Sequence, residues 1–88
     1  MKPIRRHRKF EKNFRSRVSP NSKLKKQFAA RLELFKEGIR EYPLDDHPLV
    51  GTKKGLRAFS IGGDLRVVYR ETESHYEFLD IGSHNQVY

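Results

Sequence analysis

The sequence predicts an α+β fold in which two N-terminal helices pack on one face of a small, twisted, mainly antiparallel sheet. Apolar residues recur every three or four positions in the first half of the chain, whereas short alternating runs fill residues 56–81. The expected order of elements is β-α-α-β-β-β. A chain of 88 residues has no room for a second core, so residues 1–88 are expected to form a single domain.

Two helices are predicted in the first half of the chain, and they form a helical hairpin. Phe10, Phe14 and Val18 stand four residues apart and indicate a short helix over about residues 9–17. The second helix has the strongest periodicity in the chain, and Pro43 marks the point by which it must end. Its apolar stripe consists of Leu24, Phe28, Leu32, Phe35 and Ile39.

Two features of this half allow alternatives. Residues 2–9 are strongly basic and form either a tail or a short edge strand, which Lys and Arg would protect from pairing with other chains. The second helix can be capped at its N-terminus by Ser19, Asn21 or Ser22.

The second half of the chain is predicted to be a β meander that follows a long loop. Residues 43–55 are dense in Pro, Gly and Asp, and a loop of this length either carries function or covers the core. Residues 56–61 and 65–70 form a hairpin around the turn sequence Gly62-Gly63-Asp64. Residues 75–81 form the third strand, and Gly82 ends it. Strict alternation places Tyr76, Phe78 and Asp80 on one face of this strand and Glu77, Leu79 and Ile81 on the other.

Charge and composition restrict the partners and the chemistry. The formal net charge is +8, which favours a nucleic acid, an anionic membrane surface or an acidic protein as partner. The chain has no cysteine, which excludes disulfides and thiolate chemistry and fits a reducing, cytoplasmic setting. No apolar run approaches the roughly 20 residues that span a bilayer, and no apolar stretch follows the basic N-terminus as in a signal peptide.

Histidines are the candidate catalytic groups. The four histidines stand at no metal-ligand spacing and no phosphate-binding glycine motif is present, so neither a metal nor a cofactor is expected. His47 lies in the loop and His84 follows the last strand, and imidazole is suited to proton transfer near neutral pH. Beside arginines, such histidines suggest RNA cleavage by 2′-hydroxyl attack. The alternative is that both are ordinary polar residues of a loop and a strand end.

Two segments resemble the RelE superfamily of bacterial toxin–antitoxin ribonucleases, and its YafQ branch in particular. They are DDHPLVGTKKGLRAFSIGGDLRVVYR and FLDIGSHNQVY, and the resemblance extends over the whole chain. It implies a sheet that carries the active cleft, and metal-independent cleavage of mRNA in the ribosomal A site, beside 16S rRNA. It also implies inhibition by a cognate acidic antitoxin, with operator DNA bound only through the antitoxin complex and no membrane partner.

The resemblance further implies roles for particular residues. His47 and His84 correspond to catalytic histidines, and Asp64 corresponds to an active-site acid. Arg66 matches a strand arginine that binds the phosphate, and Tyr88 matches a C-terminal aromatic residue that stacks on a base or closes the edge of the core. The basic residues expected to bind substrate are Arg57, Lys53, Lys54 and Arg70.

Two positions depart from the YafQ pattern. Ser60 stands where such members carry another histidine, and Leu65 stands where they carry a tryptophan. These departures imply an altered rate or codon preference, or a loss of activity. Two alternatives therefore accompany the enzyme hypothesis: a non-catalytic RNA- or ribosome-binding module, and a protein whose main role is to bind an antitoxin and repress its own operon.

Overall fold

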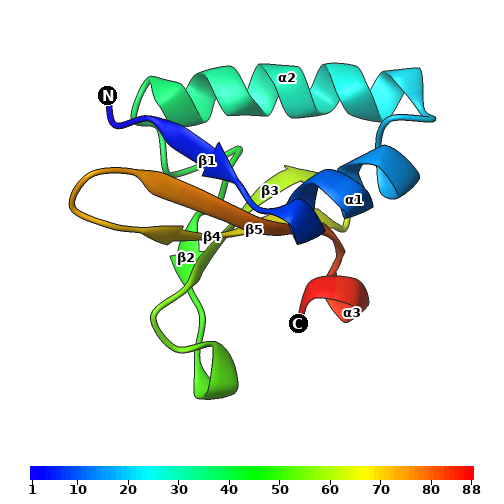
Figure 1. The fold of residues 1–88 in the computed structure, drawn as a ribbon. Helices are drawn as coiled ribbons and strands as arrows, with labels where there is room; N and C mark the ends of the chain where they lie inside the picture. Colours follow the sequence, from blue (N-terminus) through cyan, green and yellow to red (C-terminus); the bar gives the residue numbers. More distant parts are fainter.

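The computed structural model describes residues 1–88 and contains a helical hairpin, a five-stranded sheet and a short C-terminal helix (Figure 1). The helices are α1 (Arg8–Arg17), α2 (Ser22–Lys36) and α3 (His84–Val87), and η1 (Gly51–Lys53) is a 3₁₀ helix. None of the helices has the length and apolar character that crossing a membrane requires. The strands are β1 (Ile4–Arg6), β2 (His47–Pro48), β3 (Arg57–Gly62), β4 (Leu65–Glu71) and β5 (Tyr76–Ser83).

The sheet is mainly antiparallel, with the strand order β1-β5-β4-β3-β2. Only β1 is parallel to its neighbour. Because β1 stands at the end of this order and pairs with β5, the basic N-terminal segment is an edge strand rather than a tail. The α1–α2 hairpin covers one face, and α3 and the connection between β2 and β3 lie on the other (Figure 1). The predicted fold class is confirmed, with β2 and α3 as elements that the sequence analysis did not include.

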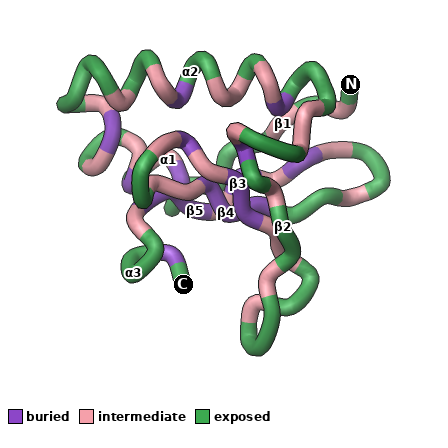
Figure 2. The backbone as a smooth tube through the Cα atoms, turned by 180° about the vertical axis from the view of Figure 1, so that it is seen from behind, coloured by how far each residue is buried: buried purple, intermediate pink, exposed green.

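The core lies between the α1–α2 hairpin and the sheet, where buried positions are concentrated along β3, β4 and β5 (Figure 2). The ring centroid of Phe35 lies 4.8 Å from that of Phe59, 5.1 Å from that of Tyr69 and 5.6 Å from that of Phe78. Each aromatic side chain can bury about 150–250 Å². A few rings therefore supply a large share of the apolar burial that so short a chain needs.

The ends of α2 are fixed by one amide side chain and one glycine. Oδ1 of Asn21 accepts hydrogen bonds from the backbone N–H of Lys23 at 3.0 Å and of Leu24 at 3.1 Å, so Asn21 is the N-cap among the three candidates. Gly38 has a φ of +88°, in the left-handed region that ends helices. Ile39, predicted as the last residue of the apolar stripe, therefore lies beyond the helix.

β5 departs from strict alternation. The cross-strand pairs Tyr69–Phe78 and Val68–Asp80 leave one residue of β5 between them without a partner, which defines a β-bulge. Beyond the bulge, Ile81 joins Phe78 in the helix-facing core. The prediction that these two residues lie on opposite faces was wrong, because an extra residue reverses the faces that follow it.

The buried carboxylate of Asp80 connects β5 to α1. Its Oδ1 accepts hydrogen bonds from Nδ2 of Asn13 at 2.6 Å and from the backbone N–H of Ile81 at 2.8 Å. The cationic groups of Lys9 and Arg17 lie 3.5 and 3.7 Å from the carboxylate oxygens. Such donors and cations are what a buried carboxylate requires, so Asp80 fixes α1 against the second half of β5.

Replacing Asp80 by Ala is expected to lower the free energy of unfolding by about 2–4 kcal/mol, because it removes the acceptor of the buried Asn13 amide. Urea denaturation followed by circular dichroism measures this change. Glu73→Ala is the control, because Glu73 is exposed, and its effect should stay below about 0.5 kcal/mol. Equal stability of the two variants would contradict the role given to Asp80.

Candidate active site

The face of the sheet opposite the α1–α2 hairpin carries the candidate site. Ala58, Val68 and Val87 form a small apolar cluster there, which holds α3 against β3 and β4. The entry to α3 is fixed by the backbone N–H of Ser83, which donates to Oε1 of Gln86 at 2.7 Å. β5 continues to Ser83, so Gly82 does not end the strand as predicted. The C-terminal residues are thus held over the open face of the sheet (Figure 1).

Four of the predicted catalytic residues lie together around the end of the chain, and we call His47, Arg66, His84 and Tyr88 the C-terminal cluster. The hydroxyl of Tyr88 lies 3.4 Å from Nε2 of His47. The rings of His84 and Tyr88 meet edge to face, with centroids 4.5 Å apart. Arg66 approaches from β4, and its guanidinium influences the pKa of Tyr88. Residues from β2, β4 and α3 therefore meet in one place.

The protonation states in the C-terminal cluster follow from its hydrogen bonds and burial. Nδ1 of His47 lies 2.9 Å from the carbonyl oxygen of Asp45, which can only accept, so Nδ1 carries the proton of the neutral ring. Nε2 is then free to accept. Burial raises the pKa of Tyr88, and the Arg66 guanidinium acts in the opposite direction. The phenol is neutral at pH 7 and can donate to His47.

Asp64 and Ser60 lie at the border of this cluster. Asp64 is exposed in the turn between β3 and β4, and its carboxylate contributes to the raised pKa of Tyr88. Ser60 is the cross-strand partner of Arg66, so the position at which YafQ-like members carry a histidine adjoins the cluster. His, Cys, Asp and Glu side chains form no group of three or more that could hold a metal ion.

The basic residues predicted to bind substrate differ in whether their charge is already paired. Nε of Arg57 donates to Asp46 at 2.6 Å, and Nε of Arg70 donates to Glu77 at 2.7 Å. Arg57 also pairs across the sheet with Tyr69 of the helix-facing core, so it does not join the C-terminal cluster. The basic residues without an ion pair are Lys53, Lys54 and Arg66.

Lys53 lies close to the cluster. Together with His47, Tyr88 and the apolar side chains of Leu49 and Val50, it lines a cavity of about 320 Å³ between α3 and the β2–β3 connection. The structure therefore brings one predicted substrate-binding lysine to the cluster, along with Arg66.

Asp46 is the residue that the sequence analysis missed. Its fully buried carboxylate accepts hydrogen bonds from Nε of Arg57 and from the hydroxyl of Tyr69, and Nε of Arg40 lies 4.0 Å away. The hydrogen bond to Asp46 raises the pKa of Arg57, and burial raises the pKa of Tyr69. Because His47 follows directly, this carboxylate fixes the position of a candidate catalytic residue. The only sequence signal was an aspartate next to that histidine.

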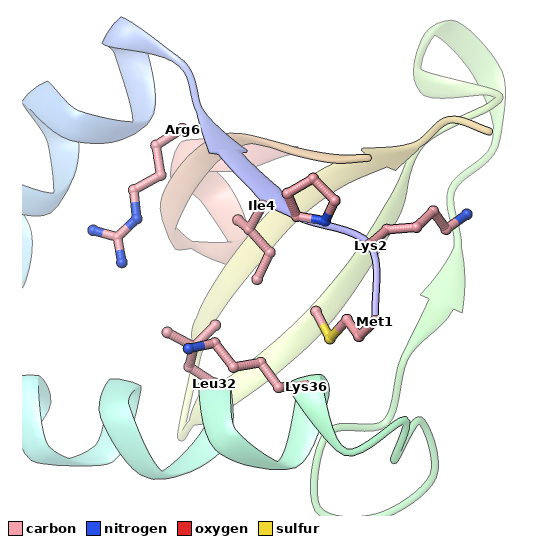
Figure 3. A pocket seen from close by; sticks show the side chains of 7 residues that line it. Met1, Lys2, Ile4, Arg6, Leu32 and Lys36 are labelled. Atoms are coloured by element: carbon pink, nitrogen blue, oxygen red, sulfur yellow. The ribbon is translucent and has the colours of Figure 1, made fainter. Parts of the chain in front are cut away.

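A separate groove of about 460 Å³ lies between β1 and α2 (Figure 3). Ile4 and Leu32 give it an apolar floor, and Lys2, Arg6 and Lys36 stand around it. Each of these three side chains is already paired with a carboxylate. The pairs are Lys2–Glu71 at 2.6 Å, Arg6–Glu11 at 3.7 Å and Lys36–Glu33 at 3.8 Å.

The helical hairpin packed on one face of a small, mainly antiparallel sheet is a RelE-like fold. Residues 2–88 match the family model described as "Bacterial toxin of type II toxin-antitoxin system, YafQ". The chain therefore belongs to the YafQ family of toxins, which confirms the resemblance seen in the sequence. No match is found among curated proteins.

Solved structures share the fold over their full length. YafQ from E. coli has a TM-score of 0.82 and 19% identity, and the alignment covers 100% of this chain and 99% of that one. YafQ in the E. coli DinJ–YafQ complex has a TM-score of 0.80 and 20% identity, with 100% and 99% covered. A metal-bound toxin from Helicobacter pylori has a TM-score of 0.81 and 26% identity, with 100% of both chains covered.

The pH dependence of stability should reveal the pairing of Glu77. The hydrogen bond from Arg70 and the imidazole of His75, whose Nε2 lies 3.2 Å from the carboxylate, lower the pKa of Glu77 from 4.5 to about 2. Because this pKa is lower in the folded state, the ionised carboxylate contributes stability above pH 4.5 that is lost as the pH falls through about 2. Glu77→Gln should therefore lose less stability than the wild type over this range.

Urea midpoints measured at several pH values across this range check the expectation. Glu73→Gln is the matched control, because Glu73 is an exposed glutamate of the preceding turn. A midpoint that falls as steeply in Glu77→Gln as in the wild type would show that the pairing of Glu77 with Arg70 and His75 does not contribute.

Proposed function

We propose that this toxin is an endoribonuclease that cleaves mRNA in the ribosomal A site through 2′-hydroxyl attack on the adjacent phosphate. The observation that supports this function is the meeting of His47, His84 and Tyr88 beside Arg66 on the open face of the sheet. Membership of the YafQ toxin family supports the same conclusion. Dependence on the ribosome and the absence of a metal requirement rest on the resemblance to RelE-like ribonucleases.

This reaction needs a base, an acid and positive charge near the phosphate. The base removes the 2′-hydroxyl proton, the 2′ oxygen attacks phosphorus, and the 5′ oxygen leaves with a proton from the acid. The products are a 2′,3′-cyclic phosphate and a 5′-hydroxyl end. His47 suits the base because its Nε2 is the unprotonated nitrogen. His84 suits the acid because its exposed ring makes no hydrogen bond within the chain and can carry a second proton.

The remaining members of the cluster support the charged groups. Arg66 forms no ion pair, so its planar guanidinium can bind two phosphate oxygens as negative charge develops. The Tyr88 hydroxyl lies beside Nε2 of His47 and must give way there to the 2′-hydroxyl of the substrate, while the Tyr88 ring leaves a face on which a nucleobase can stack. The negative charge of Asp64 would favour the protonated form of His84, the proposed acid. Lys53 and Lys54 would attract the RNA backbone.

The same proposal includes an acidic antitoxin as the protein partner. YafQ of E. coli is solved in complex with DinJ, and the net charge of +8 here favours an acidic binding partner. Contact with operator DNA is then expected only through the antitoxin complex.

His84→Ala is expected to lower the single-turnover cleavage rate of translated mRNA by about 10²–10⁴-fold, because it removes the proposed acid. Purified protein, programmed ribosomes and primer extension measure this rate. His7→Ala is the control, because His7 is an exposed histidine that precedes α1, and it should keep the wild-type rate.

No cleavage by the wild-type protein, with or without ribosomes, would overturn the proposed activity. Salt-sensitive ribosome binding that persists without cleavage would instead support the non-catalytic alternative that Ser60 and Leu65 suggest.

Arg66 and Arg70 form a matched pair on β4, because they stand four residues apart and only Arg70 is paired with a carboxylate. Arg66→Ala is expected to lower the single-turnover rate by about 10²–10³-fold through loss of charge stabilisation at the phosphate. Arg70→Ala should leave this rate within a few-fold of the wild type. Equal losses in the two variants would contradict the specific role of Arg66.

A further inference from the structure

A second crevice lies on the other side of α3 from the C-terminal cluster. Residues four apart share one side of a helix, so His84 and Tyr88 face the cluster while Gln86 faces away. Gln86 lines a crevice of about 610 Å³ between the N-terminal end of α2 and the turn joining β3 and β4. Asp64 also lines it. The crevice therefore begins where the proposed catalytic cluster ends.

We propose that this crevice binds one unpaired nucleotide of the RNA substrate, next to the scissile phosphate, with its base against the carboxamide of Gln27. The inference rests on the proposed ribonuclease function and adds a substrate subsite to it. Three features of the crevice support it, namely an unpartnered amide, a nearby free cation and an apolar side chain.

The amide belongs to Gln27 on α2. Its carboxamide makes no hydrogen bond within the chain, so it presents both a donor and an acceptor to the crevice. The side chain lies beside Gly62, where an added Cβ would be 3.2 Å from Oε1 and 3.4 Å from Cδ of Gln27. A carboxamide can read the edge of a nucleobase through paired hydrogen bonds.

The cation and the apolar side chain suit the rest of a nucleotide. Lys23 lines the crevice and forms no ion pair, so its ammonium group is available to a phosphate. Leu65 offers an apolar surface to the flat face of a base. Arg17, the other cation in the crevice, already donates to the carbonyl oxygen of Ile81 at 2.9 Å. The lysine and arginine side chains of the groove between β1 and α2 are, in contrast, each paired with a carboxylate.

Titration of the isotope-labelled protein with each of the four ribonucleoside 5′-monophosphates tests the subsite. Binding should shift the side-chain amide signals of Gln27 and the backbone amide signals of Gly62 and Gly63. Gln27→Leu should lower the affinity for the most tightly bound mononucleotide by about tenfold. Lys26→Leu, an exposed residue of the same helical turn outside the crevice, should bind like the wild type.

Several results would overturn the inference. Shifts confined to other residues would place the nucleotide elsewhere. If inorganic phosphate caused the same shifts and bound with the same affinity as the mononucleotides, the crevice would be an anion site that does not recognise the nucleobase. Unchanged affinity in Gln27→Leu would show that the carboxamide does not contact the base.

Cleavage mapping separates this inference from the proposed function. Gln27→Leu should still cleave translated mRNA but lose base preference at one position beside the cut, while Lys26→Leu should keep the wild-type pattern. An identical pattern in Gln27→Leu would reject the subsite and leave the ribonuclease proposal intact. A wild-type protein that binds mononucleotides in the crevice but cuts no RNA would reject the ribonuclease proposal instead.

Discussion

The buried carboxylate of Asp46 is the interaction on which the candidate site depends. It connects the segment after α2 to β3 through Arg57 and to β4 through Tyr69. A carboxylate without solvent is stable only with such donors, so the backbone on either side of it has little freedom. His47 is the next residue, and its Nδ1 is held by the carbonyl oxygen of Asp45. The geometry of a candidate catalytic histidine is therefore set by an ion pair on the helix-facing side of the sheet.

The distribution of paired and unpaired cations divides a chain of net charge +8 into regions with different roles. Cations around the β1–α2 groove and at the far end of β4 are neutralised by nearby carboxylates, so they contribute to the fold more than to binding. Arg66, Lys53 and Lys23 form no ion pair, and they lie along the path from the cavity beside His47 to the crevice beside Asp64. A polyanion is attracted where positive charge is uncompensated, so these three cations suit the RNA substrate of the proposed function.

The sequence predicted the elements whose hydrophobic periodicity is long, and it failed where the structure depends on contacts between distant residues. The helices and the meander follow from the stripe that contains Phe35 and from alternating runs such as residues 65–70. The β5 bulge has no local signal, because it is defined by the register against β4. The pairing of Arg57 with Asp46 joins residues 11 positions apart, and no sequence pattern predicted it. Grouping His47 with His84 came from the family resemblance, since spacing alone cannot bring a loop and a C-terminus together.

The short C-terminal helix links the stability of the sheet to the proposed chemistry. A helix of four residues has too few hydrogen bonds to persist alone, so α3 depends on its contacts with the sheet. The burial of Val87 between Ala58 and Val68 supplies those contacts, and the Ser83–Gln86 hydrogen bond sets the angle at which the helix leaves β5. His84 and Gln86 then point to opposite sides, one toward the proposed catalytic cluster and one toward the proposed nucleotide crevice. Because one small apolar contact orients both sides of α3, a change in that contact would displace His84 and Gln86 together, while the main core around Phe35 stayed in place.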